Sequence, residues 1–163
     1  MNLLVAYFTA TGVTARVAQK LADVTGAELY SICPAVAYST RDLDWTNSGS
    51  RSSVEMKDKN FRPKLSDKWA PVAKADVIFL GFPVWWYREP SVIDSFLDAY
   101  DFTGKKIIPF ATSGGSDIGE EAHARIAVLT GAEILEGKKF AAGVSREELK
   151  LWADKVLNLS EGR

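Results

Sequence analysis

Three short segments of the sequence carry the side chains and glycines that could bind a ligand. The first is Thr9-Ala10-Thr11-Gly12-Val13-Thr14, which lies between an apolar run and a stretch with helical periodicity. Free backbone N–H groups and the helix dipole at a helix N-terminus favour an anion. The segment has no lysine, and the pattern G-x-x-x-x-G-K-[ST] is absent, which disfavours a nucleoside triphosphate. We therefore expect a phosphate held by neutral donors, with an ordinary threonine-rich helix cap as the alternative.

The second segment, Gly81 to Tyr87, ends in three consecutive aromatic residues, Trp85-Trp86-Tyr87. It follows an apolar run and precedes Pro90, which can open a helix. Bulky aromatics in such a loop favour a flat ligand ring stacked on an indole, because offset stacking adds about 0.5–1.5 kcal/mol beyond area burial. The alternative is that these rings fill the core or a subunit interface. We expect at least one of them to contact a ring-shaped ligand.

The third segment, Thr112 to Gly119, is a glycine-rich turn after another apolar run. Glycines allow backbone N–H and C=O groups to approach the edge of a ligand closely. Taken alone, the segment is equally well explained as a flexible connection.

Apolar runs of strand length alternate with segments of helical periodicity along the chain. The runs are Leu3 to Phe8, Glu28 to Ile32, Val77 to Phe82, Lys106 to Ala111 and Glu133 to Phe140. This alternation predicts an α/β fold, a doubly wound sheet of five parallel strands covered by helices on both faces. In such sheets ligands bind beyond the carboxyl ends of the strands, which is where the three segments lie. The stretch from about Pro34 to Trp69 is polar and too long for an ordinary connection, so we expect a functional or mobile loop.

Local signals set the ends of several expected helices. Gly26 and Gly131 stand where helices end, Pro90 can open a helix, and Ser145 with Glu148 forms a capping box for a C-terminal helix.

Length, charge and rare residues limit the classes of function. A chain of 163 residues fits a single domain over residues 1–163, and 20 basic against 21 acidic residues argue against nucleic-acid binding and a polybasic membrane anchor. One cysteine and one histidine, Cys33 and His123, exclude an intrachain disulfide and make a metal site improbable. We expect Cys33 to pack as a small apolar residue. No apolar run approaches the roughly 20 residues of a membrane span, so we expect a soluble, cytoplasmic protein.

Taken together and in order, T-x-T-G-x-T, G-F-P-V-W-W and T-S-G-G-S resemble the flavodoxins, and most closely the subfamily with a G-[FY]-P-x-W-W motif. The resemblance covers nearly the whole chain and implies a flavodoxin-like three-layer fold with strand order 2-1-3-4-5, one non-covalent FMN and electron transfer. The residues implied to bind FMN are Thr9, Ala10, Thr11, Gly12, Val13, Thr14, Pro83, Val84, Trp85, Trp86, Tyr87, Thr112, Ser113, Gly114 and Gly115.

Some residues depart from the family pattern. The best-known flavodoxins supply a tyrosine after strand four that covers the outer flavin face, whereas Thr112 to Gly119 contains no aromatic. Trp45 could cover that face or simply anchor its own loop, and a nicotinamide, a quinone or a partner protein could also occupy it. Arg88 and Asp117 would each place a charge near the ring.

The favoured function is that of an FMN-binding electron carrier with a redox partner protein and no catalytic side chain of its own. The alternative is an NAD(P)H-dependent FMN oxidoreductase acting on quinones or similar acceptors. It is favoured by an outer flavin face that could be open and by the modest net charge, since electron-carrier flavodoxins are usually strongly acidic and the sequence pI is near 5.9. A flavin-free phospho-receiver would need acidic residues after strands one and three, and Tyr7-Phe8-Thr9 and Gly81-Phe82-Pro83 supply none.

Overall fold

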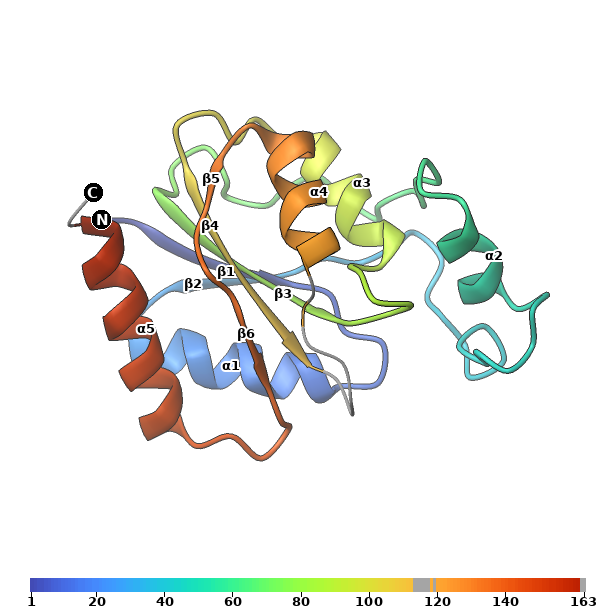
Figure 1. The fold of residues 1–163 in the computed structure, drawn as a ribbon, viewed down its shortest axis with the longest axis horizontal. Coiled ribbons are helices and arrows are strands. Elements are labelled where there is room, and N and C mark those ends of the chain that lie inside the picture. Colours follow the sequence, from blue (N-terminus) through green and yellow to red (C-terminus); the bar gives the residue numbers. More distant parts are fainter. Residues whose placement is uncertain (113–117, 119, 162–163) are drawn as a thin grey trace.

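The computed structural model describes residues 1–112, 118 and 120–161, in which a parallel sheet lies between two layers of helices (Figure 1). The strands are β1 (Leu3–Tyr7), β2 (Glu28–Ser31), β3 (Val77–Pro83), β4 (Lys106–Thr112), β5 (Glu133–Ile134) and β6 (Lys138–Phe140). The helices are α1 (Val13–Thr25), α2 (Arg51–Lys57), α3 (Ser91–Ala99), α4 (Glu120–Thr130) and α5 (Arg146–Glu161).

The strand order is β2-β1-β3-β4-β5, all parallel, which confirms the predicted order 2-1-3-4-5. Helices α1 and α5 cover one face of the sheet, and α3 and α4 cover the other (Figure 1). Strands β3 and β4 are buried along nearly their whole length because both of their faces meet helices. The sequences of these two strands are almost continuously apolar because the strands lie in the centre of the sheet.

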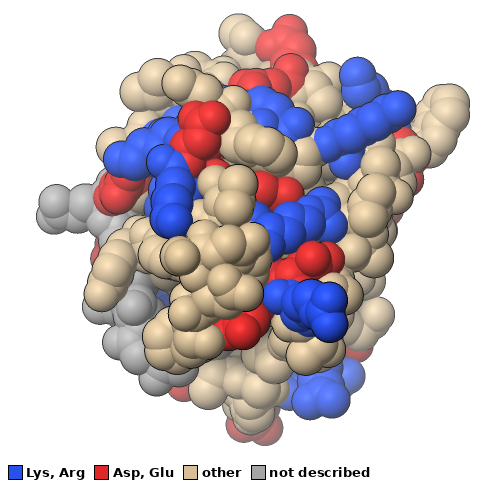
Figure 2. Space-filling model, turned by 90° about the vertical axis from the view of Figure 1, so that its right-hand side faces the viewer, with Lys and Arg blue, Asp and Glu red and all other residues tan. Residues whose placement is uncertain are grey.

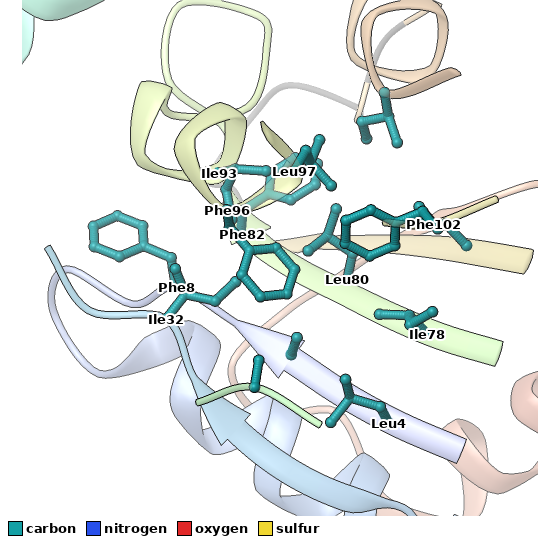
Figure 3. Packing of buried hydrophobic residues seen from close by; sticks show 14 of the residues in the cluster. Leu4, Phe8, Ile32, Ile78, Leu80, Phe82, Ile93, Phe96, Leu97 and Phe102 are labelled. Carbon is teal, nitrogen blue, oxygen red and sulfur yellow. The ribbon is translucent and has the colours of Figure 1, made fainter. Parts of the chain in front are cut away.

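The helix ends follow the local signals. Helix α1 ends at Gly26, which has φ 72° and donates its N–H to the carbonyl of Ala22, as expected of a left-handed C-cap. Helix α3 begins one residue after Pro90, and its apolar face packs on the sheet next to Phe82 and Leu80 (Figure 3). The backbone N–H of Glu148 donates to the Ser145 hydroxyl at 3.1 Å, the contact expected of a capping box.

The fifth predicted strand is interrupted, so the sheet contains a sixth strand. Both β5 and β6 pair with β4, but the register runs from Ile107 opposite Ile134 to Phe110 opposite Lys138. The chain advances four residues from Ile134 to Lys138, whereas the paired part of β4 advances three from Ile107 to Phe110, and this mismatch indicates a bulge. The interruption lies beside Pro109 of β4, which has no N–H to donate to a neighbouring strand.

The segment of residues 34–69, here called the insert, was predicted as a loop, yet it contains helix α2. Helix α2 begins after Ser50, whose side chain accepts from the Ser53 N–H, and lies outside the two helix layers (Figure 1). The insert is held against α3: the Ser95 hydroxyl donates to the Pro63 carbonyl at 2.7 Å. Just before the insert, the Cys33 side chain is exposed, so the expectation that it packs as a small apolar residue is wrong.

Among the helices in the described part of the chain, none has the length and apolar character that a membrane span needs.

Candidate functional site

The ends of β1, β3 and β4 bring the three predicted segments to one edge of the sheet. Tyr7 lies opposite Gly81, and Pro83 lies opposite Thr112. Beyond the strand ends, the Phe8 N–H donates to the Gly81 carbonyl at 3.0 Å, and the Val84 N–H donates to the Thr112 carbonyl at 3.2 Å. The juxtaposition is therefore confirmed for the described residues. Ser113, Gly114, Gly115 and Asp117 lie outside them.

The first segment forms a turn that opens into the N-terminus of α1. Gly12 is the N-cap, with φ 97°, a left-handed conformation that side chains disfavour. Its N–H donates to the Thr9 hydroxyl oxygen at 3.0 Å, so the Thr9 hydroxyl hydrogen can still be donated to a ligand. The first turn of α1 contains no acidic residue. The free N–H groups there, together with the helix dipole, can bind an anion.

The three threonine hydroxyls of this segment have different surroundings. Thr11 is exposed and Thr9 is half-buried, whereas Thr14 is buried and its hydroxyl lies 2.7 Å from that of Thr112. The Thr14 side chain therefore joins α1 to the end of β4. Its backbone N–H, in the first turn of α1, remains in the position that suits an anion. That Thr14 binds a ligand stays a prediction.

The second segment divides into one packed ring and two exposed rings. Trp85 meets Phe8 edge-on at 5.6 Å between ring centroids and Tyr38 at 5.3 Å, so its ring is half-buried. Trp86 is 42% exposed and Tyr87 is 73% exposed. The core-filling alternative therefore describes part of the role of Trp85, while Trp86 and Tyr87 offer free faces to a flat ligand.

Trp86 and Tyr87 are the central residues of a tight turn, residues 85–88, here called the aromatic turn. Their φ angles are 48° and 67°, and two backbone hydrogen bonds of 3.0 and 3.1 Å join Trp85 and Arg88. Such turns normally use Asn or Gly at both central positions. Each residue held in this region costs about 1–3 kcal/mol, and such strain concentrates at ligand sites.

The aromatic turn is anchored by a buried cluster of charges, formed by Arg88, Glu89, Asp94 and Arg125. The Arg88 guanidinium lies 3.4 Å from the Asp94 carboxylate. Arg125 of α4 lies 2.7 Å from Glu89 and 2.8 Å from Asp94. Arg88 is only 2% exposed and is paired with Asp94, so any charge that it places near the ring is already neutralised in the folded chain. That Arg88 lies near the ring stays a prediction.

The two carboxylates of this cluster titrate abnormally. Burial, followed by repulsion from Asp94, raises the pKa of Glu89 to about 7, although Arg125 lowers it. Burial also raises the pKa of Asp94. One oxygen of each carboxylate, Glu89 Oε2 and Asp94 Oδ1, has no hydrogen-bond partner among the described residues. The anchor thus pairs opposite charges but leaves these two carboxylate oxygens without partners in the described part of the chain, which makes the cluster costly to bury.

The insert supplies Tyr38 to the site. The Tyr38 hydroxyl donates to the Glu55 carboxylate, and the Arg51 guanidinium lies 3.9 Å from the ring centroid and 2.8 Å from Glu55. Burial and the Glu55 carboxylate raise the pKa of Tyr38. These contacts fix the ring against which Trp85 packs.

Sequence reasoning missed Tyr38 and the charge cluster. Asp94 gave the one usable signal, because an acid between the apolar residues Ile93 and Phe96 of a helix needs a buried partner. Nothing in the local pattern identifies that partner as Arg88 or Arg125.

A pocket of 290 Å³ opens at the aromatic turn. It is lined by Val84, Trp85, Trp86 and Tyr87 and, from the insert, by Trp45. A flat ring fits the chemistry of these walls.

Several solved structures are similar to this chain over nearly its whole length. A candidate flavoprotein from Bacteroides eggerthii is 39% identical, with a TM-score of 0.89, over 96% of this chain and 98% of its own. One from Bacteroides uniformis is 44% identical, with a TM-score of 0.88, over 94% and 97%.

A flavoprotein from Lactobacillus acidophilus, solved in complex with FMN, is 19% identical, with a TM-score of 0.69, over 93% and 98% of the two chains. At that identity the likeness shows the fold alone. A comparison with curated proteins found no match. The family model described as flavodoxin matches residues 2–156, and this chain belongs to the flavodoxin family.

Proposed function

We propose that this chain binds FMN at the carboxyl edge of the sheet and acts in electron transfer. The observation that carries the proposal is the meeting, at one edge, of an acid-free helix N-terminus and a strained turn with two exposed aromatic rings. An anion site beside an aromatic site matches a ligand with a phosphate at one end and a flat ring at the other. Membership of the flavodoxin family supports the same ligand.

The residues present fit the phosphate end of FMN. Thr9 and Thr11 offer hydroxyl donors, and the N–H groups of Val13 and Thr14 belong to the first turn of α1. Gly12 adopts the left-handed conformation that turns the chain into the helix. These neutral donors would hold a dianion without a lysine or arginine.

The ring end of the site has a different character. Pro83, Val84 and the aromatic turn would flank the isoalloxazine, and Thr112, with Ser113 to Gly115, would face its edge. Bound FMN supplies the redox chemistry. The chain's own residues bind and orient the cofactor, and we assign none of them a catalytic proton transfer.

A second candidate function is that of an NAD(P)H-dependent reductase of quinones or similar acceptors. It is favoured by the surface around α2, where basic and acidic side chains are interspersed (Figure 2). The whole chain carries a formal net charge of −1. A weak, mixed field gives little long-range steering of an oppositely charged protein partner, whereas a small substrate needs none.

The test of FMN binding compares two ligands. The apoprotein is titrated with FMN and with riboflavin, which lacks the phosphate, and flavin fluorescence quenching reports binding. We expect FMN to bind more tightly than riboflavin. The substitution Thr11→Ala should weaken FMN binding by about tenfold, because it removes a hydroxyl donor to a charged group, and leave riboflavin binding unchanged. Absence of FMN binding refutes the proposal.

The same holoprotein separates the two functions. NADPH and NADH are added anaerobically while the flavin absorbance is followed. Fast bleaching identifies a reductase. Bleaching only after a separate reductase is added identifies an electron carrier.

A further inference from the structure

Trp45 is a large apolar side chain that the packing of its own loop leaves unexplained. It is 74% exposed, and among the described residues its indole makes no hydrogen bond or ring contact. The turn that carries it is closed by other groups: the Asp44 carboxylate accepts from the Thr46 N–H at 3.1 Å, and the Asp44 carbonyl accepts from the Asn47 N–H at 3.2 Å. The explanation that Trp45 anchors its own loop is therefore not supported.

The indole instead lines the pocket at the aromatic turn. Val84 to Tyr87 line the same 290 Å³ space, although Trp45 lies about forty residues earlier in the sequence. A pocket lined by aromatic side chains from two distant segments suits one occupant, a flat ring that both segments can contact.

The insert is held in place by specific contacts. Arg51 donates to the carbonyls of Val36 at 2.8 Å and Ala37 at 3.3 Å, and the Ser52 N–H donates to the Asp42 carbonyl at 3.0 Å. The segment before Trp45 is thus tied to the start of α2, which follows Trp45 in the chain.

The two segments that line the pocket share one anchor. The Arg88 guanidinium, at the end of the aromatic turn, donates to the carbonyl of Met56 in α2 at 3.1 Å. The Ser91 hydroxyl donates to the Glu55 carbonyl of the same helix at 3.4 Å. Since Arg88 also pairs with the buried Asp94, the insert and the aromatic turn keep a fixed relation to each other.

We propose that Trp45 closes the flavin site by stacking on the isoalloxazine face that the loop after β4 leaves without an aromatic cover. The inference rests on the proposed function, because the occupant is the ring of FMN. It assigns to the insert after β2 the aromatic cover that the sequence Thr112 to Gly119 cannot supply, because that sequence contains no aromatic residue.

The test uses a matched pair of exposed tryptophans. Trp69, 84% exposed and at the end of the same insert, does not line this pocket and serves as the control. The wild-type apoprotein, Trp45→Ala, Trp45→Phe and Trp69→Ala are titrated with FMN and riboflavin, and urea unfolding of each apoprotein checks folding. Trp45→Ala should weaken both ligands by the same factor, about 5- to 10-fold, because it acts on the ring and not on the phosphate. Trp45→Phe should stay within about twofold of the wild type, since it keeps an aromatic face. Trp69→Ala should bind as the wild type does.

The possible outcomes separate the two proposals. Wild-type affinity in Trp45→Ala, or an equal loss in Trp69→Ala, overturns the role of Trp45 and leaves FMN binding standing. Loss of FMN affinity with unchanged riboflavin affinity also overturns it, because the residue then acts at the phosphate. A wild-type chain that binds neither ligand overturns the proposed function and this inference with it.

Discussion

Substitution of Gly81 by alanine should destabilise the protein through one steric contact in the centre of the sheet. Gly81 lies in β3, just before the aromatic turn, and pairs with Phe110 of β4. A Cβ atom built on Gly81 would lie 2.2 Å from Cζ and 2.5 Å from Cε2 of the Phe110 ring. Carbon atoms pack at about 3.5–4.0 Å, so the ring or the strand would have to move by more than about 1 Å.

The surroundings of Phe110 decide the size of the effect. Its side chain is fully buried, so the ring has no solvent-facing direction into which to move. Overpacking of this kind typically costs about 1–3 kcal/mol, and we expect Gly81→Ala to lie at the upper end. With a urea m-value of about 2 kcal/mol/M, the unfolding midpoint would fall by roughly 1–1.5 M.

Urea unfolding of the apoprotein, followed by far-UV circular dichroism, measures this change. Gly143→Ala is the matched control, because a Cβ at Gly143 would meet nothing within 4 Å; it should stay within about 0.5 kcal/mol of the wild type. Phe110→Leu shortens the opposing ring, so Gly81→Ala should cost at least about 1 kcal/mol less in that background. Equal midpoints for the two glycine variants, or additive costs in the double variant, would refute the steric argument.

Two other buried groups give sharp predictions. The raised pKa of Glu89, about 7 against 4.5 in the unfolded chain, means that protonation stabilises the fold: this contribution is complete below about pH 4.5 and is lost as the pH rises to about 7. Relative to Glu89→Gln, the wild type should therefore lose at most about 1.4 kcal/mol of unfolding free energy per pH unit over that range, and parallel pH profiles in urea titrations would contradict the raised pKa. For the buried hydroxyl pair, Thr14→Val and Thr112→Val should each cost about 1–3 kcal/mol by leaving one hydroxyl without its partner, while the double variant should cost less than the sum. Additive costs in a thermal unfolding cycle would show that the two hydroxyls do not depend on each other.

Much of the sheet was predictable because its signals are local. The apolar runs that became β3 and β4 follow from burial on both faces, and Gly26 ends α1 because it adopts a left-handed conformation. The single predicted strand from Glu133 to Phe140 failed because its continuity depends on β4. Pro109 in that neighbouring strand removes a donor, and the partner strand bulges there.

The part of the candidate site that follows from the order and direction of the strands was predictable. Parallel strands place their carboxyl ends at one edge, so the segments beginning at Thr9 and Gly81 had to meet there. Two of the residues that contact Trp85 and Arg88 are instead positioned by helix α2 of the insert. The sequence of this helix has no strong hydrophobic periodicity that would predict it. No local sequence pattern therefore predicts the contact of Tyr38 with Trp85 or that of the Met56 carbonyl with Arg88.

The charge cluster explains how a strained turn and an insert outside the helix layers can line the same pocket. Two non-glycine residues with positive φ disfavour the aromatic turn, and buried carboxylates with unpartnered oxygens add a further cost. Both costs are met during folding, before any ligand arrives, because the contacts of Arg88 with Asp94 and Met56 belong to the folded chain. A ligand that enters between Trp45 and the turn then has less conformational entropy to remove than one that must order two free loops. A substitution that weakens the anchor at Arg125, which is more exposed than Arg88, should consequently reduce the affinity of the protein for FMN and for riboflavin alike. Arg125 itself does not line the pocket.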